Sequence, residues 1–402
     1  MRALSSARLG ADFTKLWTAS AVSNIGDGVT MAAGPLLVAS VTENPALIAG
    51  AVFAQQLPWL LFALISGAYV DRFDRRRLVV AVNMVRAVAL AGLAVAVATE
   101  SATVSVIYAV VFLLGTGETL ADTAMGALLP SVAPADRLPE ANARLHATFA
   151  IGNQLAAKPL GAWLFVISAA APFGLNALTF AMSAAVMASL RTVPQTGSDP
   201  VRRAGLWGEI AEGVRWLWRH RLLRTLAVSM GLANVAFCAA FAVFVLYCRQ
   251  RLGLSDLGYG FLLTVFAVGG LAGTTLAAQL GRRFGNPTLL RTGLIIELTT
   301  HLVLAITTTP WVAAVVLIVF SLHGMVWGIT VASIRQRLVP AALRGRVGST
   351  YALLDLGGAA IGSLLGGLIA SAWEITTPFW IAAAVMTIVT AAAWRPLGTA
   401  AS

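Results

Sequence analysis

The chain has 402 residues, of which 58% are hydrophobic and 11% are charged, and its formal net charge is +11. Soluble domains are about 45–50% apolar and about 25% charged, so this composition excludes a soluble enzyme, a disulfide-rich secreted domain and a disordered chain. Continuous apolar runs argue against an outer-membrane barrel, whose strands alternate polar and apolar residues. At roughly 20 residues per span, the length suits about 12 membrane helices.

Apolar runs long enough to span a membrane occur along the whole chain. They lie at residues 16–41, 46–70, 78–99, 103–129, 145–168, 172–192, 222–248, 258–280, 288–309, 311–334, 347–372 and 376–394. A count of 11 or 13 is the alternative, because only Ala171, Pro172 and Phe173 interrupt the stretch 145–192.

The cations indicate the orientation of these runs. With the N-terminus in the cytoplasm, 24 of the 28 Lys and Arg residues fall on the inner side, and only Arg249 and Arg251 fall on the outer side. Cytoplasmic loops are enriched in Lys and Arg, so we expect twelve spans with both termini in the cytoplasm. We therefore expect a multi-pass protein of the cell (plasma or inner) membrane, and we assign its basic charge to orientation rather than to nucleic-acid binding.

The longest loop divides the chain into two halves. We expect an N-terminal six-helix bundle over residues 1–192 and a C-terminal six-helix bundle over residues 222–402. Between them, residues 193–221 are expected to form a cytoplasmic linker, whose second part has the apolar spacing of an amphipathic helix.

The two halves share a sequence pattern. An Arg-x-x-x-Thr-aromatic-Ala-x-x-Asn/Asp pattern runs from Arg144 to Asn153 and recurs 202 residues later from Arg346 to Asp355. Duplicated six-helix halves are typical of secondary transporters. The expected fold class is an all-α membrane protein with twelve helices in two pseudo-symmetric bundles. Small residues give the eleventh run a smooth face for close helix contact, namely Gly358, Gly362 and Gly366.

A charged motif follows the second run and reads Gly67-Ala-Tyr-Val-Asp71-Arg72-Phe-Asp74-Arg75-Arg76-Arg77. The glycine permits close helix approach, and an aspartate at a helix end needs an arginine or a helix N-terminus as its partner. We interpret the motif as a latch that holds one gate of an alternating-access transporter closed. The alternative is that its charges only set the topology.

This motif resembles the inner-loop motif of the major facilitator superfamily. Residues 113–130, 209–224 and 337–367 resemble its exporter branch, which holds macrolide-efflux and enterobactin-exporter-like proteins. The resemblance implies twelve helices around a central cavity and proton-driven export, so the expected protein is a proton-coupled antiporter associated with multidrug resistance. The fourth run departs from many drug–proton antiporters, because it lacks the Arg that they carry there.

Ionisable side chains within the runs are the candidate functional residues, because a charge in the bilayer is costly and is retained mainly for function. Asp27 lies about half-way along the first run, close to Asn24, and Lys158 lies half-way along the fifth. The resemblance implies that both helices line the cavity. Three states of Asp27 are open on this basis, namely pairing with Lys158, contact with a water-filled cavity, and protonation at rest. In each of them we expect protonation of Asp27 to couple protons to transport.

Two further carboxylates and two residues of the second half complete the candidate site. Glu118 and Asp122 lie one helical turn apart on the fourth run, and Arg86 is their expected counter-ion. A structural ion network that holds the N-terminal half together is the alternative. In the second half, Glu297 and Asp355 are the candidate pathway residues.

Metal, cofactor and nucleotide chemistry are not expected. Glu297 and His301 lie one turn apart and His323 lies in the next run, but a packed, hydrogen-bonded His301 is the simpler interpretation. The sequence holds neither a G-x-x-x-x-G-K-[ST] loop nor a G-x-S-x-G elbow, so neither an ATP-driven pump nor an enzyme is expected.

The function expected from the sequence is secondary active efflux of an amphipathic small molecule, such as a drug, an antibiotic or a siderophore. Protons, the substrate and the lipid bilayer are the expected partners, and a monomer is expected to suffice. An importer of a small nutrient with the same fold is the first alternative. A membrane-embedded acyltransferase or a non-transporting scaffold is the second.

Overall fold

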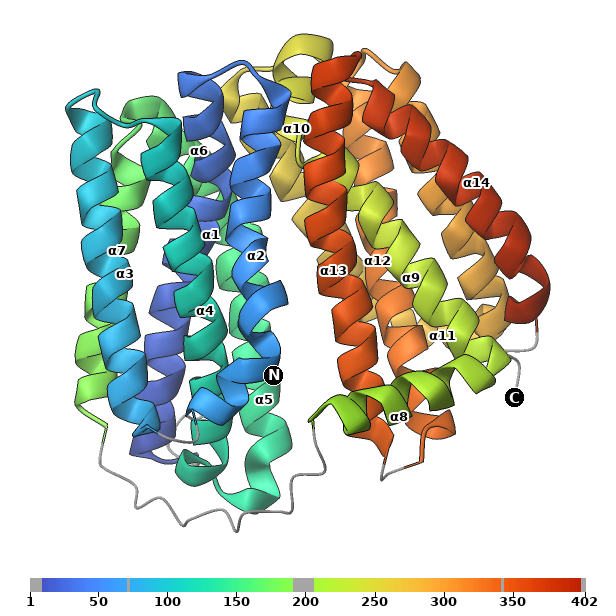
Figure 1. Cartoon of the computed structure of the whole chain (residues 1–402), viewed down its shortest axis with the longest axis horizontal. Helices are drawn as coiled ribbons and strands as arrows, with labels where there is room; N and C mark the ends of the chain where they lie inside the picture. Colours follow the sequence, from blue (N-terminus) through green and yellow to red (C-terminus); the bar gives the residue numbers. More distant parts are fainter. Residues whose placement is uncertain (1–8, 71–72, 191–205, 341–342, 399–402) are drawn as a thin grey trace. The chain divides into compact units, whose positions relative to one another are not determined.

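The structure, a computed structural model, describes residues 9–70, 73–190, 206–340 and 343–398. Regular secondary structure in these ranges is helical throughout, which confirms the all-helical class expected from the sequence (Figure 1). Nine of the helices in the described ranges are long and apolar enough to cross a membrane. They are α2, α3, α4, α7, α9, α11, α12, α13 and α14.

The helices of the first part of the chain follow the expected runs closely. Their bounds are α1 (Ala11–Val41), α2 (Pro45–Val70), α3 (Arg75–Ala98), α4 (Val104–Val132), the short 3-10 helix η2 (Ala135–Arg137), α5 (Leu138–Thr148), the π-helix η3 (Phe149–Ala157), α6 (Lys158–Ile167) and α7 (Ala171–Ala188). The expected fifth run is therefore one continuous helical path in which a π-helix lies between two α-helices. Such π-helical segments occur frequently at functional sites.

The remaining helices begin with the expected amphipathic one. Their bounds are α8 (Leu206–Arg219), α9 (Arg221–Phe241), the short α10 (Phe244–Leu246), the π-helix η4 (Tyr247–Arg251), α11 (Asp256–Ile306), α12 (Pro310–Leu338), α13 (Arg344–Ala372) and α14 (Thr377–Leu397). Within α11, Gly285 has φ 73° and ψ 161°, a conformation that glycine adopts without the penalty of a side chain. The 51 residues of α11 are therefore two consecutive helices that meet at a kink.

The chain forms two compact units. Unit 1 comprises residues 1–43, 54–198 and 256–264, and unit 2 comprises residues 44–53, 199–255 and 265–402. The first residues of α2 thus belong to unit 2, and the first residues of α11 belong to unit 1. The boundaries expected from the sequence, at 192 and 222, stay a prediction.

Buried polar contacts join three helices of unit 1. The Asn83 side-chain amide of α3 donates to the Ser183 hydroxyl of α7 over 3.1 Å, and that hydroxyl donates to the Ala19 carbonyl of α1 over 2.9 Å. All three residues are buried. An unpaired polar group in an apolar interior costs free energy, so these bonds favour one arrangement of α1, α3 and α7.

Unit 2 is organised around the close contact of α9 with α13. A Cβ atom at Gly362 would lie 2.4 Å from the Val235 carbonyl oxygen, and one at Gly366 would lie 2.0 Å from that of Ala239. The two backbones are therefore closer than any residue with a side chain allows at these positions. On α8, Leu217 is fully buried in the core of this unit, whereas Trp218 is 49% exposed.

Candidate functional site

An ion pair between α1 and α3 is the centre of the candidate site in unit 1. Arg86 Nη2 lies 3.1 Å from Asp27 Oδ1, and only 4% of the arginine side chain is exposed. Asn176 of α7 also lies close enough to interact with the Asp27 carboxylate, and its side-chain amide donates to the Thr30 hydroxyl over 2.7 Å. The Arg86 guanidinium lies 3.8 Å from the centre of the Phe180 ring, which stabilises it by a cation–π interaction.

The residues next to Asp27 explain why it is held so closely. A Cβ atom at Gly26 would lie 2.0 Å from Thr179 Oγ1, and one at Gly28 would lie 2.5 Å from the Asn153 carbonyl oxygen. The Gly-Asp-Gly sequence therefore lets α7 and η3 approach α1 on either side of the carboxylate.

Asn24 lies one turn before Asp27 and connects α1 to the π-helix η3. Its backbone carbonyl accepts a hydrogen bond of 2.9 Å from the side chain of Asn153. Its own side chain donates to the Ser20 carbonyl over 2.7 Å. The expected cavity position of Asn24 is thus a point of attachment between two helices of unit 1.

Glu118 and Asp122 of α4 join Asp27 and Arg86. The charges of Asp27, Arg86 and Asp122 all act on Glu118, and the Trp59 side chain of α2 lies close enough to interact with it. A Cβ atom at Gly117 would lie 2.6 Å from Arg86 Cδ, so the arginine lies directly against this part of α4. We call Asp27, Arg86, Glu118 and Asp122 the carboxylate cluster.

The pairing within this cluster differs from the expected one. Asp27 makes its ion pair with Arg86, a partner that the sequence analysis had assigned to Glu118 and Asp122, whereas Lys158 was the partner considered there for Asp27. Arg86, expected as the counter-ion of Glu118 and Asp122, lies close enough to interact with both but makes its ion pair with Asp27. Lys158 is buried at the start of α6, directly after η3. The π-helix η3 changes the angular position of Lys158, which follows it directly, relative to a regular α-helix.

The inner-loop motif is described only in part. Gly67 lies in α2, whereas Asp71 and Arg72 lie outside the described residues. Arg75 Nη1 donates to the Ala127 carbonyl of α4 over 3.2 Å, and Arg76 donates to the Ala188 carbonyl at the end of α7.

These arginines therefore attach the start of α3 to the last turns of α4 and α7, where helix dipoles favour cations. The Asp74 side chain caps α3 by accepting a bond from the Arg77 backbone N–H over 3.0 Å. The described part of the motif thus fixes the positions of three helices within unit 1.

Unit 2 holds a second set of buried polar groups. Glu297 Oε2 lies 3.1 Å from His323 Nε2, and both side chains are less than one-tenth exposed. The Asn234 amide of α9 donates to Asp355 of α13, both to its carboxylate over 2.9 Å and to its backbone carbonyl over 2.6 Å. His301, expected to be hydrogen-bonded, is packed against Phe320, and its two ring nitrogens lack a hydrogen-bond partner among the described residues.

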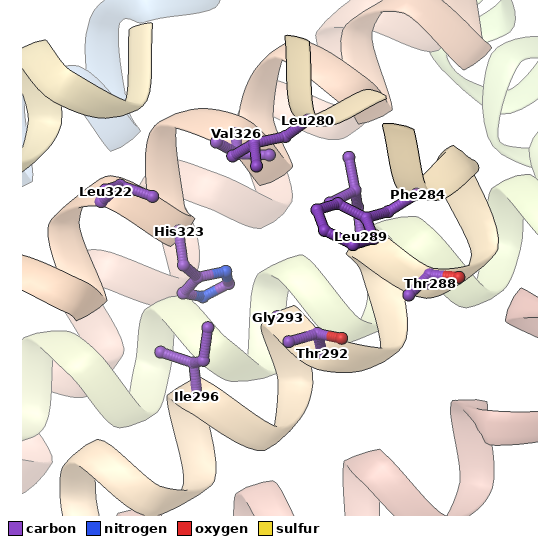
Figure 2. A pocket seen from close by; sticks show the side chains of 10 residues that line it. All are labelled: Leu280, Phe284, Thr288, Leu289, Thr292, Gly293, Ile296, Leu322, His323 and Val326. Atoms are coloured by element: carbon purple, nitrogen blue, oxygen red, sulfur yellow. The ribbon is translucent and has the colours of Figure 1, made fainter. Parts of the chain in front are cut away.

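Two cavities of unit 2 meet at His323. The first, of about 330 Å³, is lined by aromatic, methionine and polar side chains that include Asn234, Glu297 and Asp355. The second, of about 280 Å³, is shown in Figure 2, where His323 extends from α12 toward Gly293 and Ile296 of α11. Apart from the histidine, its lining is two threonines, a glycine and apolar side chains.

Several residues of these sites were not among the sequence candidates. Trp59 and Asn176 lie close to carboxylates of the cluster, and Asn234 donates a hydrogen bond to Asp355. Asn176 and Asn234 each lie in an otherwise apolar run, which was a usable signal because buried amides need partners. Trp59 gave no such signal, since tryptophan is common in membrane helices.

Comparisons with known proteins identify the class of protein that this fold and these sites serve. A family model described as transmembrane secretion effector matches residues 5–397. The multidrug efflux pump Tap of Mycolicibacterium fortuitum is 26% identical over 374 residues, which cover 90% of each chain. An uncharacterised transporter of the major facilitator type from Mycobacterium tuberculosis is 30% identical over 300 residues, 70% of this chain and 65% of that protein.

Solved structures share the fold at low sequence identity. A mutant of the nucleoside transporter NupG has a TM-score of 0.79 at 11% identity, covering 96% of this chain and 99% of that one. A bacterial homologue of the iron transporter ferroportin, in its inward-facing state, has a TM-score of 0.74 at 17% identity, covering 97% and 98%. The chain is a membrane transporter that belongs to the transmembrane secretion effector family of the major facilitator superfamily.

Proposed function

We propose that this transporter is a proton-coupled exporter of an amphipathic small molecule. The observation that carries the proposal is the carboxylate cluster, in which three carboxylates are close enough to act on Arg86. Charges in a membrane interior are retained mainly for proton or substrate pathways. The similarity to Tap, which is named a multidrug efflux pump, supports efflux as the direction.

The proposed architecture is twelve spans in two six-helix bundles, joined by the linker at residues 193–221. It treats α5, η3 and α6 as one span, α9, α10 and η4 as another, and the two parts of α11 as two. The Lys and Arg asymmetry supports cytoplasmic termini in the cell membrane. The central cavity expected from the family resemblance stays a prediction, as does a monomeric state.

Proton exchange follows from competition for Arg86. When Asp27 is ionised, it holds the guanidinium, and when it is protonated, Arg86 is released toward Glu118 or Asp122. The cluster thereby binds a proton in one arrangement and loses it in another, as alternating access requires. One charge moved through 100 mV is worth ~2.3 kcal/mol, about a 50-fold substrate gradient, so one or two protons suffice.

The remaining candidate residues receive supporting roles. Asn24 of α1 contacts the π-helix η3, and Lys158 follows η3 directly in the chain. A change of helical register in η3 would therefore move both contacts and alter the wall of the proposed cavity. The inner-loop residues Gly67, Asp71, Arg72, Arg75 and Arg76 form the gate latch. In the second half, Glu297 and Asp355 belong to the substrate pathway.

Transport by purified protein in vesicles tests the proposal. An imposed pH gradient is expected to accumulate one or more of a cationic, an anionic and a neutral amphipathic dye, without any covalent product by mass spectrometry. Asp27→Asn is expected to abolish this accumulation. The matched control is Asp12→Asn on the same helix, because Asp12 is 30% exposed and pairs with Lys15 three residues on.

Full gradient-driven accumulation by Asp27→Asn would place the coupling site elsewhere, with Glu118 and Asp122 the next residues to test. Accumulation driven in the import direction would support the nutrient importer instead. A covalent product formed without any movement of dye would point to an enzyme.

A further inference from the structure

We propose that unit 2 contains a binding site for a lipophilic organic cation, in the cavity lined by Phe237, Phe266, Phe320, Glu297 and Asp355. This inference names the substrate class and rests on the proposed export function. It assigns ligand binding to unit 2 and leaves proton exchange to the carboxylate cluster of unit 1.

The cavity is built by helices of a single unit. Its lining residues come from α9, both parts of α11, α12 and α13, and its volume is about 330 Å³. Small-molecule sites are concave, mostly apolar and about 300–1,000 Å³ in volume, with a few polar groups that orient the ligand. This cavity has that composition, since Glu297, Asp355, Asn234, His323 and Ser321 are the polar groups among its mostly apolar lining.

Three phenylalanine rings form an aromatic wall of the cavity. The ring centres of Phe237 and Phe320 are 5.3 Å apart, and that of Phe266 lies 6.1 Å from each of them. The face of an aromatic ring attracts cations, and it also stacks on aromatic ligands. Met230 and Met325 in the same lining are flexible side chains that adapt to ligands of different shape.

The charged groups of the cavity favour a cation over an anion. Its lining includes the carboxylates of Glu297 and Asp355 and, within the described part of the chain, no Lys or Arg. Asn234 donates to Asp355 but is neutral, so it leaves the negative charge in place. His323 offsets the charge of Glu297 only when the imidazole is protonated. A carboxylate removed from water is stabilised by a cation beside it, and a ligand anion would be repelled.

The neighbouring cavity in Figure 2 provides an internal comparison. It is similar in size, at about 280 Å³, but its lining includes no carboxylate among the residues that the structure describes. That lining is mostly apolar, with Leu280, Leu289 and Val326 among the side chains. A ligand bound there would be selected by its apolar surface and not by the sign of its charge. The two cavities therefore predict different responses to a change of ligand charge at constant shape.

Tetraphenylphosphonium and tetraphenylborate are probes of nearly identical shape and opposite charge. Binding of each to the purified full chain in neutral detergent is measured by isothermal titration calorimetry, without any gradient. We expect the cation to bind at least tenfold more tightly than the anion. Glu297→Gln and Asp355→Asn are each expected to weaken cation binding at least tenfold.

Two further variants serve as controls, and a third tests the aromatic wall. Glu374→Gln removes an exposed carboxylate of unit 2 and is expected to leave the affinity unchanged. Leu280→Trp fills the neighbouring cavity and is also expected to leave it unchanged. Phe237→Leu removes a ring without changing charge, and is expected to weaken the cation several-fold. Thermal unfolding of each variant verifies folding, and if Glu297→Gln does not fold, Asp355→Asn and Phe237→Leu decide the result.

Equal affinity for the two probes would overturn the proposal, as would cation binding that survives both Glu297→Gln and Asp355→Asn. Loss of binding in Leu280→Trp alone would move the site to the neighbouring cavity. The outcome is separable from that of the export proposal. One outcome is that the cation binds as expected, with loss of affinity in Glu297→Gln and Asp355→Asn, and yet is not accumulated when a pH gradient is imposed. That result would support the binding site and contradict proton-driven export of the cation.

Discussion

The guanidinium of Arg86 on α3 lies 3.1 Å from the carboxylate of Asp27 on α1. Glu118 and Asp122 of α4 both interact electrostatically with Asp27 and with Arg86. Three carboxylates thus compete for a guanidinium that is almost completely buried. A buried charge that loses its partner destabilises a protein far more than removal of the whole pair does.

This asymmetry gives the first prediction. Asp27→Asn and Arg86→Met, made singly, are each expected to lower the unfolding temperature in detergent, with a cost approaching the 3–5 kcal/mol of a broken buried pair. The cost of Asp27→Asn is expected to be the smaller, because Glu118 and Asp122 still act on the arginine and the asparagine oxygen still accepts a hydrogen bond. The double variant is expected to recover much of the loss. Strictly additive effects would show that the two residues are not coupled.

Gly117 provides a way to displace Arg86 without changing any charge. A Cβ atom there would lie 2.6 Å from Arg86 Cδ, so Gly117→Ala forces the flexible arginine side chain to move. We expect gradient-driven accumulation to fall at least tenfold and the unfolding temperature to fall less than in Arg86→Met, because both charges of the buried pair are retained. Gly126→Ala on the same helix is the control, because nothing lies within 4 Å of its Cβ position. Equal transport by both variants would contradict a role for the position of Arg86.

The contact of α9 with α13 predicts a different response to the same substitution. In Gly366→Ala the added Cβ would lie 2.0 Å from a backbone oxygen, that of Ala239, which cannot move without moving its helix. We expect a loss of roughly 1–3 kcal/mol, as in other overpacked interiors. Gly348→Ala in α13, with open space at its Cβ position, is expected to be neutral or stabilising. Thermal unfolding of both variants measures the difference.

The two buried histidines of unit 2 are expected to differ in their tolerance of an apolar ring. His323→Phe removes the partner of Glu297 and is expected to destabilise the protein by about 1–3 kcal/mol. His301→Phe is expected to be neutral or stabilising, because the His301 ring nitrogens are buried without a hydrogen-bond partner among the described residues. A marked drop in unfolding temperature for His301→Phe would reveal a polar partner for this residue.

The sequence alone predicted the helices and the candidate residues of unit 1, because both depend on local properties. Hydrophobic length predicts where a helix spans, and the cost of a buried charge marks Asp27, Arg86, Glu118 and Asp122 wherever their partners lie. The spacing of Gly362 and Gly366 likewise predicted a close helix contact, which the structure places against α9.

Only the tertiary structure decided which of these charges pair. Arg86 rather than Lys158 contacts Asp27, and His323 rather than His301 is hydrogen-bonded to a partner, Glu297. Each choice depends on how neighbouring helices are rotated about their axes. The π-helix before Lys158 changes that rotation within a span, and the glycines beside Asp27 set how closely α7 and η3 approach. The hydrophobicity of a segment depends on that segment alone, whereas the partner of a buried charge depends on contacts among several helices. Composition therefore determined the class of protein, and helix packing determined the arrangement of its candidate site.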